Sequence, residues 1–503
     1  MKRRHSRSSD GSSGISSGSV SVASSVCDGN QNDTSVSMTS ETQLPKEETL
    51  RLRNEHLGSL TALYFRENPL KIIRAERQYM YDEEGNQYLD CINNVAHVGH
   101  CHPAVSEAAY QQMTQLYTNS RYLHDNLSTY VKRITQLFPD PLTVCFLCNS
   151  GSEANDLALR LARAHTGGSE VITLFGAYHG HIQSTIDISP YKWKNDMADK
   201  PKYVHVAPNP DMYRGPHANS ASPGRDYALE VKKIIDTIKL DGKQLSAFIM
   251  ESLQSCAGQV LPPPGYMTEA FRYVREAGGV CIADEVQVGF GRVGSHYWGF
   301  ETQDVIPDIV TIGKPMGNGH PIAGVITTKA IADSLGNIVS SYFNTYGGNP
   351  VSCAIGHAVL DVIEDEQLKK NAQEVGEYAV KELQKLELKH KIIGDVRGMG
   401  LFVGIEIVKN RSTREPGTAV ANEIHRRMKN RRIIISVDGA FDNVLKMKPP
   451  MCFSRSNVDH VVWSLDEVMS EIATSDVIKP LKPSTGTSHL EEVNVSHLSA
   501  ATN

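Results

Sequence analysis

Three loops of this sequence each follow a short apolar run and carry side chains that could do chemistry. The first places Gly151 and Ser152 at the start of a helix-like stretch, where free backbone N–H groups favour a phosphate. The second ends an apolar run in Asp284, an acid at the position where open α/β sheets bind their ligands. The third ends in Gly313-Lys314, and a lysine held in a desolvated pocket becomes a nucleophilic amine.

Each loop alone also has a plainer interpretation. The first could be an ordinary serine helix cap, Asp284 a solvated strand end, and Lys314 a surface charge in a turn. Together, however, a phosphate cradle, a strand-end acid and a strand-end lysine in one sheet are the parts that hold pyridoxal phosphate (PLP). That cofactor needs a lysine Schiff base, an acid against its pyridinium nitrogen and an anchor for its phosphate.

The elements that must position these loops alternate between strands and helices from about residue 46 to 475. Runs of four or five apolar residues without strict alternation predict parallel strands covered on both faces, at 170–174, 247–250, 279–283 and 308–312. Helical stretches at 152–165 and 267–277 lie between them, so we predict a doubly wound α/β domain. After Pro350 a long helix, a strand at 400–406 and a helix at 419–430 predict a smaller α+β domain.

The predicted organisation has five parts. They are a disordered Ser-rich arm at 1–45, an N-terminal segment packing with the small domain at 46–100, a large PLP-binding domain at 101–349, a small domain at 350–475 and a disordered tail at 476–503. The arm contains 14 serines among its first 40 residues and no hydrophobic periodicity, so it cannot bury enough apolar surface to fold. Its Arg/Ser-rich, acid-poor start resembles an organellar transit peptide, although it offers no apolar face.

Composition excludes several classes of protein. With 51 basic and 57 acidic residues among 503, the formal charge is −6, which argues against nucleic-acid or polybasic membrane binding. No apolar run approaches the ~18 residues that cross a bilayer. Nine scattered cysteines in so long a chain favour a reducing, intracellular compartment.

The segment from Asp284 to Gly294, followed by Pro307-Asp308 and Gly313-Lys314, resembles the class III aminotransferase family. The resemblance spans nearly all of residues 48–470 and implies an α/β enzyme of fold-type I with PLP covalently bound to Lys314. It also implies that Asp284 pairs with the ring nitrogen and keeps it protonated. The other cofactor contacts that it implies are Gly151 and Ser152 at the phosphate, Tyr178 stacked on the ring with His179 beside it, Gln287 near the ring hydroxyl, and Thr345 reaching the cofactor phosphate of a neighbouring subunit.

The role of Thr345 implies a homodimer, or a dimer of dimers, with shared active sites. The resemblance also implies a mitochondrial location, with the cytosol as the alternative. We expect neither a nucleic-acid nor a membrane partner.

Two departures set the chain apart from members of the family that transaminate ω-amino acids. Those enzymes carry a second glutamate where this chain has Cys256, and an arginine before a Pro-Pro pair where this chain reads Lys446-Met447-Lys448. Arginine grips a carboxylate as a flat bidentate fork, whereas lysine is a point charge. The departures put the second half of a transamination in doubt, unless Cys256 is a buried filler and Lys446 still binds a carboxylate.

Several motifs resemble the amino-phospholyase branch of the family, which acts on ethanolamine phosphate or 5-phosphohydroxy-lysine. They are residues 78–83, 93–103, 119–126 and 317–321. The resemblance implies a PLP-dependent lyase that releases phosphate and ammonia from a phosphorylated amine, with ethanolamine phosphate giving acetaldehyde. The candidate cations for the substrate's phosphate are Arg121, Lys446 and Lys448.

Three alternatives stay open at this point: an aminotransferase of the alanine–glyoxylate type, a 5-phosphohydroxy-lysine phospholyase, and a silent homologue that docks through its Ser-rich arm. Two other motifs are set aside. His97, His100 and His102 resemble a metal cluster, but Gly99 and Pro103 indicate a turn near the cofactor, so no metal is expected. Residues 145–148 have redox spacing but lie in an apolar run, which favours buried packing.

Overall fold

The computed structural model describes residues 43–119, 121–193 and 200–474. The predicted arm lies outside these residues except for positions 43–45, and the predicted tail lies wholly outside them. The chain divides after Pro69 into two compact units. The first unit contains the helix α1 (Lys46–His56), none of whose side chains is buried.

The second unit is organised around a seven-stranded sheet in the order β4-β10-β9-β8-β7-β5-β6. Strand β10 runs antiparallel to both of its neighbours, whereas the other pairings in the sheet are parallel. This arrangement confirms the predicted doubly wound, mostly parallel sheet. The strands are β4 (Val144–Cys148), β5 (Glu170–Leu174), β6 (Val204–Ala207), β7 (Leu245–Glu251), β8 (Val280–Asp284), β9 (Ile309–Ile312) and β10 (Ala323–Thr327).

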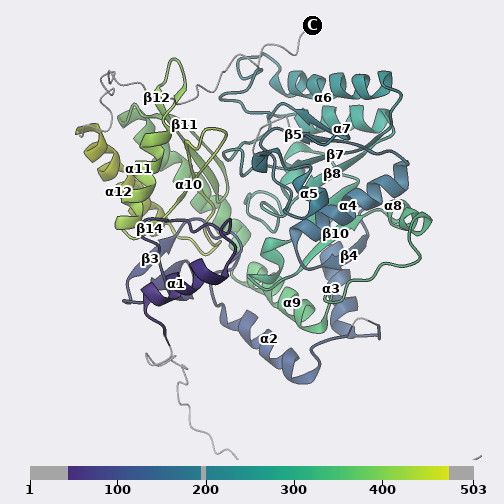
Figure 1. Cartoon of the computed structure of the whole chain (residues 1–503), viewed down its shortest axis with the longest axis horizontal. Helices are drawn as coiled ribbons and strands as arrows, with labels where there is room; N and C mark the ends of the chain where they lie inside the picture. The colour runs from purple at the N-terminus through teal and green to yellow at the C-terminus, as the bar shows by residue number, and fades with distance from the viewer. Residues whose placement is uncertain (1–42, 120, 194–199, 475–503) are drawn as a thin grey trace, which may run out of the picture. The chain divides into compact units, whose positions relative to one another are not determined.

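Side chains that alternate along the strands fill two separate cores, one on each face of this sheet. In β7, Ala247 and Ile249 pack in one core with apolar residues of α4, while Phe248 and Met250 pack in the other with residues of α6 and α7. Figure 1 shows these helices in layers around the strands. The helices of this part are α2 (Pro103–Gln115), α3 (Asp125–Thr135), α4 (Gly151–Thr166), α5 (Gln183–Ile186), α6 (Pro223–Leu240), α7 (Tyr266–Glu276), α8 (Lys329–Ser334) and α9 (Pro350–Asp365).

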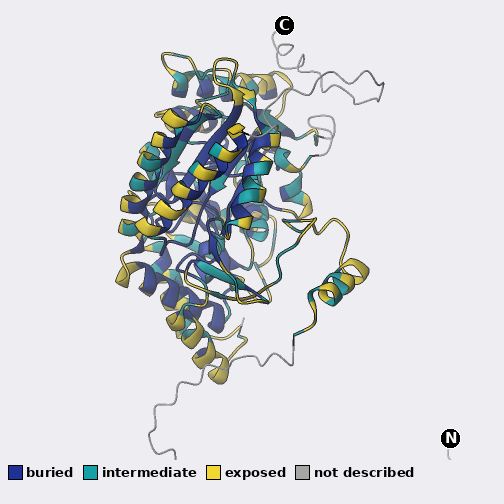
Figure 2. Ribbon diagram, turned by 90° about the vertical axis from the view of Figure 1, so that its left-hand side faces the viewer, coloured by how far each residue is buried: buried dark blue, intermediate teal, exposed yellow. Residues whose placement is uncertain are grey.

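Two smaller sheets complete the second unit. One has the order β11-β12-β16-β15, with β13 paired to β12, and the other has the order β1-β2-β3-β14. Burial in Figure 2 is greatest in the strands, and the yellow outward faces of the helices are exposed. The strands are β1 (Ile72–Glu76), β2 (Tyr79–Asp82), β3 (Gln87–Asp90), β11 (Ile393–Met399), β12 (Phe402–Asn410), β13 (Glu415–Pro416), β14 (Ile433–Ile434), β15 (Ser436–Asp438) and β16 (Val444–Met447), and the helices are α10 (Leu368–Lys389), α11 (Thr418–Asn430) and α12 (Arg455–Thr474).

The sequence predicts a single long helix after Pro350, and this prediction is wrong. Two helices, α9 and α10, occupy this stretch, and Gln367 at the start of α10 has a φ of 51°. A residue in the left-handed region cannot continue a right-handed helix, so the chain changes direction there.

The predicted domain boundaries at residues 100 and 349 stay a prediction.

The three histidines that resemble a metal cluster each have a different partner. His97 donates from Nε2 to the carbonyl of Phe290 at 2.8 Å and accepts from Arg292 at Nδ1, and burial lowers the pKa of its imidazole to about 3. His100 contacts Asp90, and His102 contacts Glu366. In the described ranges, no group of three or more His, Cys, Asp or Glu side chains is arranged to hold a metal ion, and no helix is long and apolar enough to cross a membrane.

Candidate functional site

The strand ends of the large sheet bring the three predicted loops together. Strands β8 and β9 are parallel neighbours in which Asp284 lies opposite Thr311, so Asp284 and Lys314 leave the sheet at the same edge. The N-terminus of α4 reaches that edge too. An ideal Cβ built on Gly313 would lie 3.6 Å from the Cα of Gly151, so the backbones of these two loops are in contact.

Asp284 is buried and fully partnered through its carboxylate. Its Oδ2 accepts from Asn155 Nδ2 at 2.8 Å and lies 2.8 Å from Nδ1 of His179, and its Oδ1 accepts from the backbone N–H of Val286 at 3.0 Å. Asn155 is itself fixed, because Thr311 donates to its Oδ1 at 2.7 Å. A carboxylate held on three sides has one orientation, which suits an acid that must face a fixed cationic nitrogen.

His179 carries a buried polar atom with no partner. Its side chain is fully buried, its Nδ1 contacts Asp284, and its Nε2 has no hydrogen-bond partner among the described residues. An unsatisfied buried polar atom costs free energy, so such an atom calls for an explanation. A ligand bound beside the Asp284–His179 pair would supply the missing partner of Nε2.

The first turn of α4 forms an anion cradle. Ser150 caps the helix by accepting from the N–H of Glu153, and among the described residues the N–H groups of Gly151 and Ser152 have no acceptor. Ser152 Oγ accepts from the N–H of His181 at 3.1 Å, which leaves its own proton free to donate. Gly180 permits this approach, because a Cβ there would lie 2.4 Å from Ser152 Oγ.

Lys314 begins the short 3-10 helix η4 (Lys314–Gly317), directly after β9 and Gly313. It is half-buried, and among the described residues its ammonium makes no hydrogen bond or ion pair. Its charge is near enough to lower the pKa of the lysines Lys446 and Lys448. A lysine without a partner, at the edge where Asp284 lies, is available for a covalent bond to a ligand.

Gln287 is fixed through the oxygen of its amide. Lys448 donates to its Oε1 at 2.7 Å and Asn94 donates to the same atom at 2.8 Å. Since an ammonium can only donate, the oxygen must lie on this side, and the NH₂ end of Gln287 points the other way. Gln287 is thereby oriented to donate to a ligand oxygen, as the predicted role near the ring hydroxyl requires.

Lys448 uses its ammonium to hold Gln287 and Ser255. Its ammonium also donates to Ser255 Oγ at 2.6 Å, and its side chain is buried. Burial, reinforced by nearby Lys446, lowers the pKa of Lys448 well below its ordinary value. These contacts make Lys448 a positioning residue for Gln287, and its contact with a substrate phosphate stays a prediction.

The hairpin formed by β15 and β16 places three polar residues, Ser436, Asp438 and Lys446, on one face. Ser436 lies opposite Lys446, and because side chains alternate, Asp438 shares that face. The ammonium of Lys446 forms an ion pair with Asp438 Oδ2, and both side chains are largely buried. The turn rests against the loop after β7, where the N–H of Gly439 donates to the carbonyl of Cys256 at 3.1 Å.

Tyr178 and His179 lie on the loop after β5, as expected for residues beside the cofactor. The backbone N–H of Tyr178 donates to Glu251 at 3.2 Å, and its half-buried ring contacts the ring of Tyr191 edge-on. Burial raises the pKa of both the Tyr178 hydroxyl and the Glu251 carboxyl. Stacking of Tyr178 on a cofactor ring stays a prediction.

Thr345 and Arg121 lie apart from this group. Both are exposed, and Arg121 places its guanidinium 5.3 Å from the centre of the Phe343 ring. Asn344, beside Thr345, donates to Glu153 Oε2 in the first turn of α4 at 3.0 Å and so ties the Thr345 loop to the anion cradle. The predicted roles of Thr345 and Arg121 stay predictions.

Sequence reasoning missed four residues that the structure places beside the predicted ones. Asn155 was detectable as a polar residue at a buried position of an otherwise apolar helix face. The other three act through contacts that follow only from the assembled fold, and they are Asn94, Tyr191 and Asp438.

The residues present fit PLP. At one edge of the sheet lie the cradle at α4, the fixed carboxylate of Asp284 with His179 beside it, and Lys314. Within the described ranges, His179 Nε2 and the Lys314 ammonium have no partner. The cradle offers a place for a phosphate, Asp284 for a pyridinium nitrogen and Lys314 for an aldehyde. The fold and this site define a PLP-dependent enzyme of fold-type I.

Comparison with known proteins agrees with this class. The family model described as aminotransferase class-III matches residues 64–469, and the chain belongs to that family, whose cofactor is PLP. The chain is 54% identical to the alanine–glyoxylate aminotransferase 2-like protein of Drosophila melanogaster, over 86% of this chain and 88% of that protein. It is 45% identical to the ethanolamine-phosphate phospho-lyase homolog 1 of Caenorhabditis elegans, over 84% and 94%.

Among solved structures, the chain is similar to a phospholyase from Arthrobacter in complex with phosphoethanolamine. The TM-score is 0.80 at 37% identity, and the match covers 84% of this chain and 99% of that chain.

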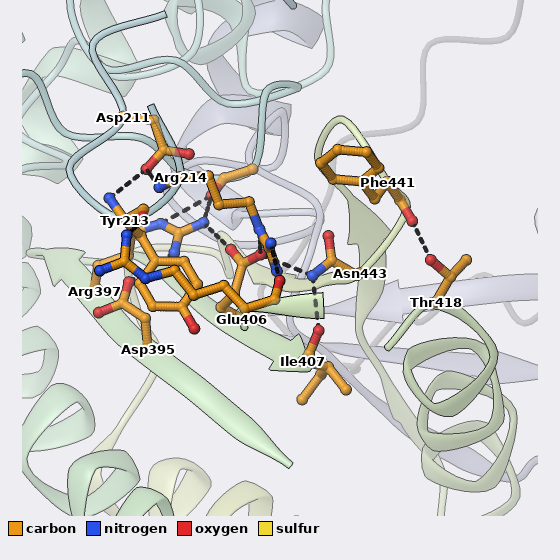
Figure 3. Close-up of polar contacts among 12 residues, drawn as sticks. Asp211, Tyr213, Arg214, Asp395, Arg397, Glu406, Ile407, Thr418, Phe441 and Asn443 are labelled. Carbon is orange, nitrogen blue, oxygen red and sulfur yellow. Dashed lines mark hydrogen bonds and ion pairs between the residues drawn. The ribbon is translucent and has the colours of Figure 1, made fainter. Parts of the chain in front are cut away.

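An ion cluster centred on Glu406 contacts the turn of the β15–β16 hairpin (Figure 3). Glu406 on β12 accepts from Arg214 at 2.6 Å, from Arg397 at 2.8 Å and from Asn443 in the hairpin turn at 2.7 Å. Arg397 also donates to the carbonyls of Gly258 and Gln259, in the loop that carries Ser255 and Cys256. The cluster therefore fixes both the hairpin and the loop that faces it.

We expect Glu406→Ala to destabilise the protein by about 3 kcal/mol, because it leaves two largely buried guanidinium groups without their shared carboxylate, although Arg397 keeps its contact with Asp395. Thermal unfolding followed by circular dichroism measures the effect. Glu415→Ala is the matched control, since its carboxylate pairs with Lys409 on the exposed surface and should shift the melting temperature little. Equal shifts for the two variants would contradict the assigned role of the cluster.

The cluster also has a defined pH dependence. Burial raises the pKa of Glu406, but Arg397 and Arg214 outweigh burial and hold that pKa below its ordinary value of 4.5. A group with a lowered acidic pKa stabilises the fold above its unfolded pKa and loses that contribution as the pH falls through its folded pKa. The difference in melting temperature between wild type and Glu406→Ala should therefore shrink as the pH falls below about 4.5.

Proposed function

We propose that this chain is a PLP-dependent phospho-lyase that eliminates phosphate from a phosphorylated amine, with ethanolamine phosphate as substrate. The observation that carries the proposal is the largely buried ammonium of Lys446, which is close enough to Lys314 for the charge of Lys314 to lower its pKa. A fixed ammonium at that point suits a phosphate monoester, which carries close to two negative charges at neutral pH. The names of the Caenorhabditis and Arthrobacter relatives support the same substrate class.

Bound PLP supplies an electron sink for the carbon that bears the amine. The residues of this chain then account for the proton and the leaving group. Lys314 removes a proton from that carbon through its amine nitrogen. The electron pair of the broken C–H bond forms a C=C bond as the C–O bond to phosphate breaks, and Lys446 stabilises the departing dianion.

The remaining two-carbon enamine takes up water to give acetaldehyde and ammonia. The balanced reaction is therefore ethanolamine phosphate plus water to acetaldehyde, ammonia and inorganic phosphate. It consumes no keto-acid. This property separates the proposal from transamination, in which every turnover needs an amino acceptor.

The deciding experiment gives purified, PLP-loaded protein ethanolamine phosphate without any keto-acid. We expect phosphate and acetaldehyde in equal amounts. Release from 5-phosphohydroxy-lysine alone would identify the other phospholyase. The aminotransferase alternative draws on the name of the Drosophila relative, and alanine-to-glyoxylate transfer without phosphate release would support it in place of our proposal.

We expect Lys446→Met to raise KM for ethanolamine phosphate about 10- to 100-fold, the effect of losing a hydrogen bond from a charged donor. Steady-state phosphate release measures KM and kcat separately. Lys409→Met is the matched control, because it removes an exposed lysine from the same sheet. Unchanged KM in Lys446→Met would remove this residue from the phosphate site.

The homodimer with shared sites is part of the proposal. Thr345 and Arg121 are exposed beside large exposed apolar side chains, which is typical of a surface that another chain covers. Those side chains are Tyr122, Leu123, Phe343 and Tyr346. A location in the mitochondrion stays a prediction.

A further inference from the structure

Asp438 holds Lys446 through an arrangement that uses both of its carboxylate oxygens. Its Oδ2 pairs with the Lys446 ammonium, and its Oδ1 accepts from the hydroxyl of Tyr191 at 2.6 Å. Tyr191 lies in the short helix η2 (Pro190–Lys192). Its backbone N–H donates to Ala177 in the loop after β5, and its ring contacts that of Tyr178. The carboxylate is thus fixed from outside the hairpin, so its direction toward Lys446 does not depend on the hairpin alone.

Burial of Lys446 opposes its charge. Burial has the largest effect on the pKa of this ammonium and lowers it, and the cations Lys314 and Lys192 also lower it. The Cys256 thiol and the Glu251 carboxyl, on the adjoining loop and strand, raise that pKa, but burial raises their own pKa values and so favours their neutral forms. Lys448 follows two residues later in the chain, just beyond the end of β16. Among the described residues, Asp438 is the only carboxylate in direct contact with Lys446.

An ammonium has three protons, and Asp438 takes one of them. The others remain available to an anion. A buried lysine without a counterion tends to lose its proton, whereas one beside a fixed carboxylate keeps it. Asp438 therefore supports phosphate binding by keeping Lys446 charged, although its own charge is negative.

We propose that Asp438, fixed by Tyr191, is a positioning residue that keeps Lys446 protonated and directed at the phosphate of the substrate. It thereby sets the upper pH limit for recognition of that phosphate. This inference rests on the proposed function, because it assigns Lys446 to a substrate phosphate.

The test compares KM and kcat for ethanolamine phosphate between pH 7 and pH 10 in wild type and Asp438→Asn. Above pH 7 the substrate phosphate is a dianion throughout, so changes in KM report on the protein and on the substrate amine, which is common to all variants. In Asp438→Asn we expect KM to rise about 10-fold or more, beginning at a lower pH than in wild type and exceeding any fall in kcat. Asp442→Asn, the same change at an exposed position of the same turn, is the matched control.

The double variant Asp438→Asn/Lys446→Arg distinguishes protonation from a merely structural role. A guanidinium keeps its charge without a counterion across this pH range, so KM should begin to rise at no lower a pH than in wild type. Tyr191→Phe should shift the KM profile in the same direction by about 3- to 10-fold, because it removes the hydrogen bond that fixes the Asp438 carboxylate but leaves its charge in place. If Asp438→Asn fails to fold, the dependence of KM on pH in Tyr191→Phe decides whether the inference holds.

A wild-type KM profile in Asp438→Asn, or in Tyr191→Phe where that variant decides, would overturn this inference and leave the proposed function intact. A KM that begins to rise in the double variant at as low a pH as in Asp438→Asn would overturn it as well. Wild-type protein that releases no phosphate from ethanolamine phosphate would instead overturn the proposed function, and this inference with it.

Discussion

Lys314→Ala should abolish phosphate release from ethanolamine phosphate, with kcat falling by more than about 10⁴-fold. The variant loses the amine that we propose removes the proton, and with it an ammonium that has no hydrogen-bond or ion-pair partner among the described residues. The effect should lie in kcat, because Lys446, Asp438 and the cradle at α4 are untouched. Phosphate release under saturating substrate measures it.

The same variant has a spectroscopic signature. Wild-type protein with PLP should show the visible absorbance of a cofactor covalently bound to lysine, and Lys314→Ala should lose that band. Lys329→Ala, which removes an exposed lysine on α8, is the control and should keep both the band and the activity. A visible band of wild-type intensity in Lys314→Ala would place the covalent link on another residue.

Asp284→Asn should lower kcat by about 10²- to 10³-fold, the scale of losing one preorganised electrostatic contact in a site that excludes water. The amide keeps the size of the carboxylate but carries no charge to hold a ring nitrogen protonated. It also has only one oxygen for the three donors that now contact Asp284, so one of Asn155, His179 and Val286 is left unsatisfied.

Glu251→Gln is the matched control for Asp284→Asn, since it neutralises another buried acid at the end of the neighbouring strand β7. Burial already raises the pKa of Glu251, so its replacement should cost much less. Measurement of kcat, together with PLP affinity from titration of the apoprotein, separates a loss of chemistry from a loss of cofactor. Equal losses of kcat in the two variants would contradict the special role of Asp284.

The parts of the site at strand ends could be predicted because the sequence itself carries the signal. Asp284 and Lys314 come directly after apolar runs, and parallel strands deliver such residues to one edge of the sheet. The start of α4 was also predictable, since Ser150 and Gly151 are typical of a helix N-terminus.

The parts that arise from the register of distant segments could not be predicted. The pairing of Asp438 with Lys446 depends on which residues face each other across a hairpin, and the contact of Tyr191 with Asp438 joins residues 247 positions apart. The split of one long helix into α9 and α10 was also missed, because Gln367 is not a residue that typically adopts a left-handed conformation.

The β15–β16 hairpin has a consequence for how this family changes its substrates. Asp438, Lys446 and Lys448 lie within a segment of 13 residues, 436–448, whereas Asp284, Lys314 and the cradle at α4 lie at the strand ends of the large sheet and the start of α4. On the proposed function, the choice of substrate and the chemistry of the cofactor are thus encoded in separate stretches of the chain. We therefore expect mutations in the hairpin to change the leaving group while the reactive centre stays unchanged. Lys448 is the point where the two meet, because its bond to Gln287 connects the hairpin to the reactive centre.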